Sequence, residues 1–237
     1  MNTITKVLSV VLIATMLMSC GFSGITGSKK VITEERNITE KFEAVKVSTG
    51  IKLFITQGSK KTLIIEADDN IISILKTEVV DGVLNIYFDK IVRNAKSKQV
   101  HLTIPTLNSL KATSGASAKS KGSLSGENII VSASSGSNID ISLNYKKIDC
   151  SGSSGSDVDI AGECGDVNLN ASSGAGIGAK NLNSKNADVS ASSGAGITIN
   201  VSEKISASAS SGGNITYYGN PADKEISKSS GGSVSAK

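Results

Sequence analysis

Very few residues in this chain could carry out chemistry. The 237 residues include one histidine, His101, three cysteines and no tryptophan. A nucleophilic serine site would have to recruit His101, but serine is so abundant here that a serine near it would carry no information. One histidine and the cysteines Cys150 and Cys164 cannot complete a closed four-ligand zinc site. We therefore predict that the protein is not an enzyme and binds no metal or cofactor, and that His101 is a structural or surface residue.

Four aspartates are the remaining candidates for a metal site. Asp157 and Asp159, with Asp140 and Asp149 one repeat earlier, could form an acidic edge able to hold Ca²⁺. The sequence lacks the glycine- and aspartate-rich nonapeptides of calcium-binding β-rolls, so solvated carboxylates are the favoured interpretation. The glycine-rich residues 174–178 are not followed by a helix that would present a phosphate site, which indicates a turn.

Any site would have to be positioned by a repeat that fills the back half of the chain. A Ser-Gly step returns seven times with its glycines 18 to 21 residues apart, at Gly115, Gly136, Gly155, Gly174, Gly194, Gly212 and Gly231. A period of this length, held over many intervals, is typical of a repeat architecture. We predict that these glycines form the corners of the repeat, where the backbone needs a positive φ or has no room for a Cβ.

Each corner glycine is flanked by alternating apolar and polar residues. Ile139 and Ile141 follow Gly136 by three and five residues, Ile129 and Val131 precede it by seven and five, and the other repeats are similar. This alternation is the period of a strand with one buried face. Two short strands per repeat are compatible with a hairpin, but the constant register favours coils that stack like on like. A flexible linker would not keep large apolar residues at fixed offsets.

The fold class follows from this pattern. We predict an all-β protein, a single-stranded parallel β-helix or β-solenoid, with coils of about 19–20 residues. Cys150 stands at a core position that is valine or leucine in neighbouring repeats, so we predict a buried thiol. Cys164 has a different offset from its glycine, which disfavours a disulfide between the two even in an oxidising compartment.

The N-terminus has the features of a bacterial lipoprotein signal. One positive charge, Lys6, precedes the apolar run VLSVVLIATMLM, which is too short to span a membrane as a helix. Residues 17–20, Leu-Met-Ser-Cys, resemble the lipobox, in which a signal peptidase cuts before the cysteine and its thiol is acylated. We predict a signal peptide over 1–19, lipidation at Cys20, and a flexible Gly/Ser-rich tether over 20–30. Glycine follows that cysteine where aspartate would favour the inner membrane, so we expect an outer-membrane anchor.

Residues 31–110 contain less glycine and serine and more large apolar residues than the repeats. The apolar positions around Ser48-Thr49-Gly50 resemble a bulkier early coil, and a solenoid needs such a capped end. We therefore predict an irregular N-terminal β part over 31–110, followed by a regular Ser-Gly repeat β-solenoid over 111–237. Within the first part we expect strands at 62–66, 83–88 and 101–104, a possible single helix at 69–77, and loops at 66–82 and 89–99.

The order of these segments resembles a known family. The lipobox is followed by VKVSTGIKLFITQG, by VVDGVLNIYF, by a strand that ends at Ile104-Pro105, and then by SGAS and serial SSG repeats. Together these motifs resemble the auto-transporter adhesin family with a head GIN domain, which is common among lipoproteins of Bacteroidetes-type bacteria. The resemblance covers about residues 36–237. It implies a secreted or surface β-solenoid with no catalytic residues to transfer.

Charge and composition narrow the classes of function. The formal net charge is +4, which is too small and too evenly spread to predict nucleic-acid binding. The leading hypothesis is a lipid-anchored cell-envelope protein whose repetitive polar face binds glycan or a surface protein. The alternatives are a polysaccharide-acting enzyme with its site in the N-terminal half, and a passive scaffold that self-associates through its last coil.

Overall fold

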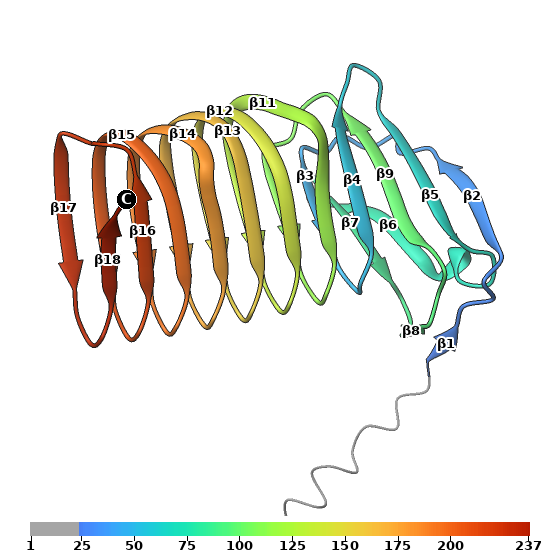
Figure 1. Cartoon of the computed structure of the whole chain (residues 1–237). Coiled ribbons are helices and arrows are strands. Elements are labelled where there is room, and N and C mark those ends of the chain that lie inside the picture. Colours follow the sequence, from blue (N-terminus) through green and yellow to red (C-terminus); the bar gives the residue numbers. More distant parts are fainter. Residues whose placement is uncertain (1–23) are drawn as a thin grey trace, which may run out of the picture.

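The computed structural model describes residues 24–237, whose elements are strands and one short 3-10 helix (Figure 1). The strands wind into a solenoid of about 7 stacked turns with parallel pairing between coils. The predicted all-β, parallel β-solenoid with irregular N-terminal coils is therefore confirmed. The predicted signal peptide over 1–19 and the predicted lipidation site Cys20 lie outside the described residues.

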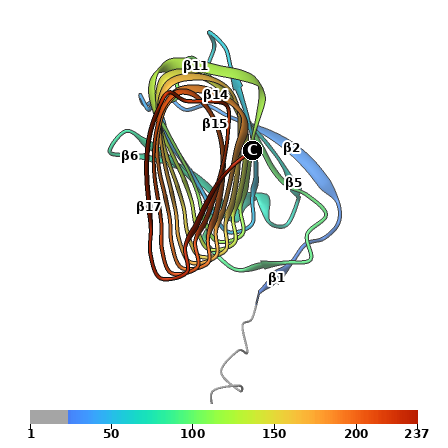
Figure 2. The same cartoon turned by 60° about the vertical axis from the view of Figure 1, so that its left-hand side comes forward.

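Each regular coil consists of one long bent strand and one tight corner (Figures 1 and 2). A strand leaves a Ser-Gly corner, runs along one side of the coil, bends at the opposite edge and returns along the other side. The bent strands are β11 (Ser117–Ala133), β12 (Asn138–Gly152), β13 (Asp157–Ala171), β14 (Gly176–Ala191) and β15 (Gly196–Ala209). The last coils divide into β16 (Asn214–Tyr218), β17 (Asp223–Lys228) and β18 (Ser233–Ala236).

The prediction of two short strands, one on either side of each corner, is therefore wrong about where a strand ends. The strand after one corner and the strand before the next are a single element in each regular coil, because backbone pairing continues through the bend. Leu143 and Tyr145 in the bend of β12, for example, have Gly162 and Cys164 of β13 as their neighbours in register. Continuous pairing leaves no exposed connecting loop on these coils, which turns the bends into a surface of strands.

The Ser-Gly corners have a constant backbone conformation. All seven corner glycines have positive φ, from 66° to 76°, and the serine before each also has positive φ, from 45° to 55°. Two successive residues in this region reverse the chain sharply. The N–H of Gly155 donates to the carbonyl of Ser173 in the next coil at 3.1 Å, and the other corners up to Gly212 repeat this bond. A Cβ at these glycines would meet nothing within 4 Å. Glycine is therefore favoured at the corner by its positive φ and not by a lack of room for a side chain.

The core is built of ladders of like residues. At each inward position, a buried side chain lies between its equivalents in the coils on either side. One such ladder comprises Ile129, Ile148, Val167, Ala187 and Ile205. Cys150 occupies a ladder of this kind between Val131 and Leu169, and both it and Cys164 are buried free thiols. The prediction of a buried thiol at Cys150 is confirmed.

The N-terminal part joins the regular coils through parallel strands. Both β3 (Ala44–Val47) and β11 pair with β10 (Ser109–Ala112), and both β9 (Lys98–Ile104) and β11 pair with β4 (Lys52–Gln57). The turn between β3 and β4 holds Thr49 and Gly50, both with positive φ. This is the bulkier early coil that the sequence predicted, and its interior is filled by larger side chains than the later coils contain.

Antiparallel strands close this end of the solenoid. The pairs are β2 (Val31–Arg36) with β5 (Thr62–Asp68), β5 with β9, and β6 (Leu75–Val80) with β7 (Val83–Phe88). The Arg36 guanidinium donates to the carbonyls of Leu75 at 2.6 Å and Ile72 at 2.9 Å. We call residues 24–110 the cap half.

The prediction of a possible helix at 69–77 is wrong. Only Ile72–Ile74 forms a 3-10 helix, η1, and β6 begins directly after it. The reason is the hairpin with β7, whose turn is Asp81-Gly82 with φ of 50° and 74°. Pairing with β7 along the whole of β6 overrides the helical spacing of a few apolar residues. The predicted loop at 66–82 is accordingly mostly η1 and strand.

The segment before β2 belongs to the folded body. β1 (Ile25–Thr26) pairs in parallel with β8 (Val92–Arg93), a short strand within the predicted loop at 89–99. This corrects the predicted tether over 20–30 from residue 24 onward, because strand pairing and hydrogen bonds hold these residues. Within residues 24–237, the only helix has three residues and is far too short to cross a membrane.

A buried carboxylate fixes that segment to the cap half. Asp68 is fully buried and accepts backbone N–H bonds from Lys29 at 2.8 Å, Lys96 at 2.9 Å and Ser97 at 2.9 Å. Burial raises the pKa of Asp68, but these N–H groups and the nearby Lys29 charge outweigh it, so the pKa lies below its ordinary value. Asp68 is therefore a charged acceptor that joins two segments distant in the sequence.

Candidate functional site: a polar groove over the strand bends

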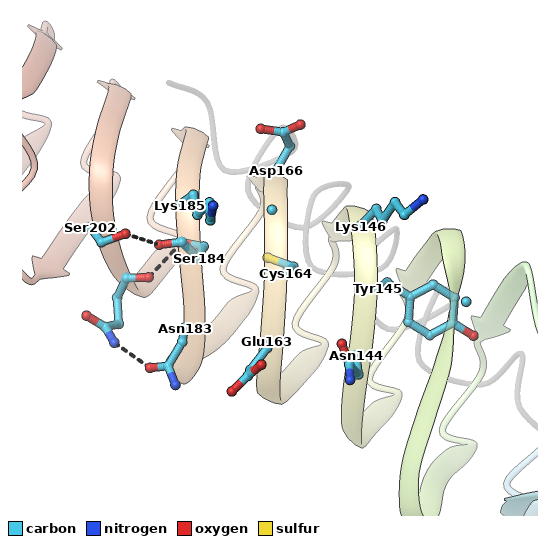
Figure 3. A pocket seen from close by; sticks show the side chains of 13 residues that line it. Asn144, Tyr145, Lys146, Glu163, Cys164, Asp166, Asn183, Ser184, Lys185 and Ser202 are labelled. Atoms are coloured by element: carbon cyan, nitrogen blue, oxygen red, sulfur yellow. Dashed lines mark hydrogen bonds between the residues drawn. The ribbon is translucent and has the colours of Figure 1, made fainter.

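A groove of about 920 Å³ runs over the bends of β12 to β15, at the edge of the coils opposite the Ser-Gly corners (Figure 3). We call it the bend groove. It is lined by Gly126, Asn144, Tyr145, Lys146, Glu163, Cys164, Gly165, Asp166, Asn183, Ser184, Lys185, Asn200 and Ser202. The corner glycines predicted from the sequence lie at the other edge and do not line it.

The floor of the groove exists because inward side chains become smaller along the bends. Tyr145, Cys164 and Ser184 are successive cross-strand neighbours, and all three are buried. The Tyr145 ring extends toward the preceding coil, where a side chain at Gly126 would collide with it. Its hydroxyl donates to the carbonyl of Leu107 at 2.7 Å. Cys164 and Ser184 are too small to fill the same space, so a hollow opens beside Tyr145.

One rim is a row of amides and a carboxylate. Asn144, Glu163, Asn183 and Asn200 are neighbours in register from β12 to β15. The Asn200 side-chain amide donates to Asn183 Oδ1 at 2.9 Å, as Figure 3 shows. Neighbouring strands are about 4.8 Å apart, so this rim presents one polar side chain per coil. Amides both donate and accept hydrogen bonds, and the carboxylate accepts.

The charges in the groove are balanced. Its lining contains two lysines, Lys146 and Lys185, and two carboxylates, Glu163 and Asp166. The two ammonium groups form exposed ion pairs with glutamates of adjacent coils, at 2.7 and 3.8 Å. The groove therefore has no excess of positive charge that would favour a polyanion. It is better suited to a neutral ligand rich in hydrogen-bonding groups.

The floor is unsuited to nucleophilic chemistry. Burial, and secondarily the charge of Asp166, raises the pKa of the Cys164 thiol to about 12. The thiol is therefore protonated at neutral pH, and a thiol is a weak nucleophile compared with a thiolate. Burial also raises the pKa of the Tyr145 hydroxyl to about 12. What the groove offers is hydrogen bonding.

His101 lies away from the groove, on the outer face of β9. Its ring stacks on that of Phe54 with the ring centroids 5.0 Å apart, and Lys121 Nζ lies 3.4 Å from its Nδ1. Burial, and secondarily the charge of Lys121, lowers the pKa of His101. Its side chain forms no hydrogen bond with a serine or aspartate of residues 24–237. The structure thus places it on the surface and gives it no partners for acid–base chemistry.

The four aspartates considered for Ca²⁺ do not converge. Asp140 and Asp159 are cross-strand neighbours, but Asp149 lies on the returning side of β12. The Asp140 carboxylate pairs with Lys119 Nζ at 2.6 Å. In the described part of the chain, no three histidine, cysteine, aspartate or glutamate side chains gather as a metal site would require.

The sequence did not identify the bend groove, and the reason is the variable length of the bends. Asn144, Glu163, Asn183 and Asn200 follow their corner glycines by 8, 8, 9 and 6 residues. Register shifts in the bends restore their alignment in space. A search for polar residues about midway between corners could have found them, whereas a search at fixed offsets could not.

The fold and this groove together define a class of protein. Residues 24–237 form a capped β-solenoid with an open groove on its outer surface, and repeat proteins of this kind offer extended outer surfaces for binding. Comparison of the sequence with known families identifies the family itself. A family model described as "Putative auto-transporter adhesin, head GIN domain" matches residues 41–221. The chain belongs to this family, and the predicted resemblance is confirmed.

Solved structures agree with this assignment. A "putative adhesin" from Bacteroides fragilis NCTC 9343 shares 28% sequence identity, with a TM-score of 0.84 over 90% of this chain and 100% of that one. A "putative adhesin" from Parabacteroides distasonis ATCC 8503 is 18% identical, with a TM-score of 0.73 over 91% and 100% of the two chains. A "putative lipid binding protein" from the same organism is 17% identical, with a TM-score of 0.69 over 90% and 99%. The last two show a common fold only.

Membership in this family supports a coarse function. The family and the Bacteroides structure are both described as adhesins, which supports a binding protein of the cell surface or envelope. A search of curated proteins found no match.

Proposed function

We propose that this protein is a lipid-anchored adhesin of the cell envelope that binds a glycan chain along the bend groove. The observation that carries the glycan assignment is the rim of Asn144, Glu163, Asn183 and Asn200, which repeats one hydrogen-bonding side chain per coil. A glycan offers hydroxyl groups at regular intervals along an extended chain, and each hydroxyl donates and accepts. Individually weak contacts then add through their number.

The anchor in this proposal is Cys20. The lipobox-like sequence before it, the apolar run over 7–18 and the single positive charge of Lys6 all support acylation of its thiol. Glycine, and not aspartate, follows this cysteine, which supports the outer membrane as the location. Only a short segment then separates the lipid from the folded body, which begins at residue 24.

The decisive experiment is a glycan-array measurement on the unlipidated mature chain, residues 20–237 with Cys20→Ser, with light scattering on the same sample. We expect saturable binding by a monomer. The variant Glu163→Ala/Asn183→Ala should lose at least about tenfold in affinity, because it removes two neighbouring hydrogen-bonding groups. The matched variant Asn168→Ala/Asp188→Ala, which changes an amide and a carboxylate on the returning side of the coils, should bind like the parent.

The other outcomes identify other functions. Turnover of a bound polysaccharide would overturn the adhesin assignment in favour of an enzyme. Absence of glycan binding with discrete oligomers would favour a self-associating scaffold. Glycan binding that both double variants reduce equally would show that the ligand lies elsewhere on the solenoid.

A further inference from the structure

A basic and apolar patch lies on the cap half, where the chain enters the folded body. Its members are Lys29, Lys90, Ile91, Arg93 and Lys96, and all five are exposed. We call it the cap patch. Ile91 is 46% exposed and is one of five large hydrophobic residues in residues 24–237 that are at least 37% exposed. A single exposed isoleucine is common on a protein surface, but this one stands among four exposed cations.

Strand pairing brings the two parts of the patch together. The N–H of Ile25 donates to the carbonyl of Ile91 at 2.8 Å, and that of Gly27 donates to the carbonyl of Arg93 at 3.0 Å. The Lys29 ammonium donates to Asn94 Oδ1 at 2.7 Å. The parallel strands β1 and β8 thus fix the entering chain beside the loop that carries the other cations (Figure 1).

Asp68 keeps this arrangement rigid. It accepts N–H bonds from Lys29 on one segment and from Lys96 and Ser97 on the other. The backbone of the patch is therefore held from beneath by a buried charge. A preformed patch loses less conformational entropy on binding than a mobile loop would.

The cations of the patch are not neutralised within the protein. Lys90, Arg93 and Lys96 form no ion pair with any carboxylate of residues 24–237. The nearby Asp69 is engaged by Lys30 at 3.7 Å and by Ser28 at 2.6 Å. An unneutralised cluster with an exposed isoleucine has the chemistry of a surface for anionic lipid head groups.

We propose that the cap patch lies against the anionic head groups of the membrane that holds the protein. This inference rests on the proposed acylation of Cys20, because that anchor sets the distance. Three residues lie between Cys20 and the start of the body at Gly24, and the four residue steps from one to the other span about 14 Å at most. The screening length at physiological ionic strength is about 8 Å, and a connection this short allows the patch to approach the head groups to within that distance.

If the cap patch lies against the membrane, the orientation of the solenoid relative to the membrane follows. The cap half faces the membrane, and the regular coils with the bend groove extend from it, since β17 and β18 form the opposite end of the stack (Figure 1). The patch adds an electrostatic contact with the head groups to the contact that the lipid makes.

The test measures vesicle binding without the lipid. The unlipidated mature chain (residues 20–237, Cys20→Ser) is sedimented with vesicles of phosphatidylcholine, alone or mixed with phosphatidylglycerol, at about 0.1 M and about 1 M salt. We expect binding to the anionic vesicles only, lost at high salt. The variant Lys90→Glu/Arg93→Glu/Lys96→Glu should lose at least about tenfold in partitioning, because each cation near such a surface contributes.

A matched variant separates the patch from overall charge. Lys224→Glu/Lys228→Glu/Lys237→Glu makes the same change in charge with exposed lysines of the last coils and should bind like the parent. A milder variant, Ile91→Ser, should weaken binding by a few-fold without any change in charge. Equal binding to both vesicle types, or equal loss in both triple variants, would overturn the proposal. Mass spectrometry of the membrane-extracted protein tests acylation of Cys20 separately, so failure of the anchor and failure of the patch are distinguishable.

Discussion

The cap half and the regular coils are stabilised in different ways. In the regular coils, each inward side chain lies between equivalents of its own kind, and each corner repeats the same backbone bond. In the cap half, strands pair in both directions, and single polar groups join segments far apart in the sequence. Arg36 bonds Leu75 and Ile72, which are 39 and 36 positions away, and Asp68 bonds Lys29 and Lys96, which are 39 and 28 positions away. Stability is therefore distributed in one region and concentrated in the other.

This difference teaches where a single substitution should matter. A repeat protein resembles a sum of similar coils and similar interfaces, so the loss of one contact leaves the same contact intact in every other coil. No second copy exists for a contact of the cap half. The sharpest test compares matched substitutions in the two regions.

The largest effect is expected for Asp68→Ala in the cap half. This substitution leaves three backbone N–H groups without their acceptor and should cost about 4 kcal/mol in the free energy of unfolding. The control is Asp188→Ala on a regular coil, an exposed aspartate, which should stay within about 0.5 kcal/mol of the parent. Urea unfolding followed by circular dichroism measures both. Similar costs for the two variants would contradict the comparison.

The Asp68 contribution should also depend on pH. The pKa of Asp68 is below its ordinary value in the folded protein, so its charged form stabilises the fold. That stabilisation is fully present above the pKa of an unfolded aspartate, about 3.9, and is lost as the pH falls through the lower folded value. The gap in unfolding free energy between the parent and Asp68→Ala should therefore be constant from neutral pH to about 5 and shrink below about 4. A gap that stays constant to lower pH would rule out this charge as the cause.

The next prediction compares the cost in unfolding free energy of a glycine-to-alanine substitution in the bend of a coil with the cost of one at its corner. Gly162, in the bend of β13, has φ of 118°, and a Cβ there would lie 2.0 Å from the Leu143 carbonyl oxygen. Gly162→Ala should cost about 3 kcal/mol through backbone strain and overpacking. Gly155→Ala, at the corner of the same coil, meets open space and should cost about 1 kcal/mol for its positive φ. Equal costs would mean that the bends are as tolerant as the corners.

The corners and the core could be predicted from the sequence because they obey local rules. A Ser-Gly step with apolar residues at fixed offsets needs no knowledge of distant contacts, and it placed residues such as Ile139 and Ile148 correctly inside. The bends could not be predicted in the same way. Their lengths differ, and the fit of Tyr145 over Gly126 depends on two coils being stacked. The bend groove was therefore missed.

The strands and contacts of the cap half could not be predicted from local sequence patterns, for a related reason. Its strands pair with partners that no repeat specifies, as the segment at 69–77 illustrates. Isolated from β7, that segment has a helical spacing of apolar residues; paired with β7, it forms a strand from Leu75 onward. The role of Asp68 could not be predicted from the sequence either, because its partners come from two other segments.

A smaller effect is expected at the free end of the regular coils. Lys224 and Lys228 of β17 stand at positions that are apolar in the preceding coils, where Ile205 and Ala209 are their partners. Both lysines are exposed at the end of the stack, and charges at such positions discourage pairing of an open edge with another chain. Lys224→Ile/Lys228→Ala should strengthen self-association by at least about tenfold, measured by sedimentation at several concentrations. The control Lys180→Ile/Lys185→Ala makes equivalent changes on the bends and should remain monomeric. Oligomers of the parent chain itself would overturn this explanation and favour the scaffold hypothesis.

The smallest effect should come from Ser156→Ala, which removes a buried hydroxyl from a regular corner. Ser156 Oγ donates to the Ala133 carbonyl at 3.0 Å and accepts the Ser153 N–H at 3.1 Å. That N–H also donates to the same Ala133 carbonyl at 3.0 Å, so both backbone groups keep a partner when the hydroxyl is gone. Alanine already occupies the equivalent position in another coil as Ala175.

We therefore expect a cost of about 0.5 kcal/mol for Ser156→Ala, measured by the same urea unfolding as Asp68→Ala. Both residues are completely buried and both accept backbone N–H groups. Burial and hydrogen bonding alone would predict similar penalties. The expected difference arises because the ladder of the regular coils supplies an alternative partner to every group that Ser156 contacts, whereas nothing in the cap half replaces the carboxylate of Asp68. A cost for Ser156→Ala close to that of Asp68→Ala would show that the coils are no more tolerant than the cap.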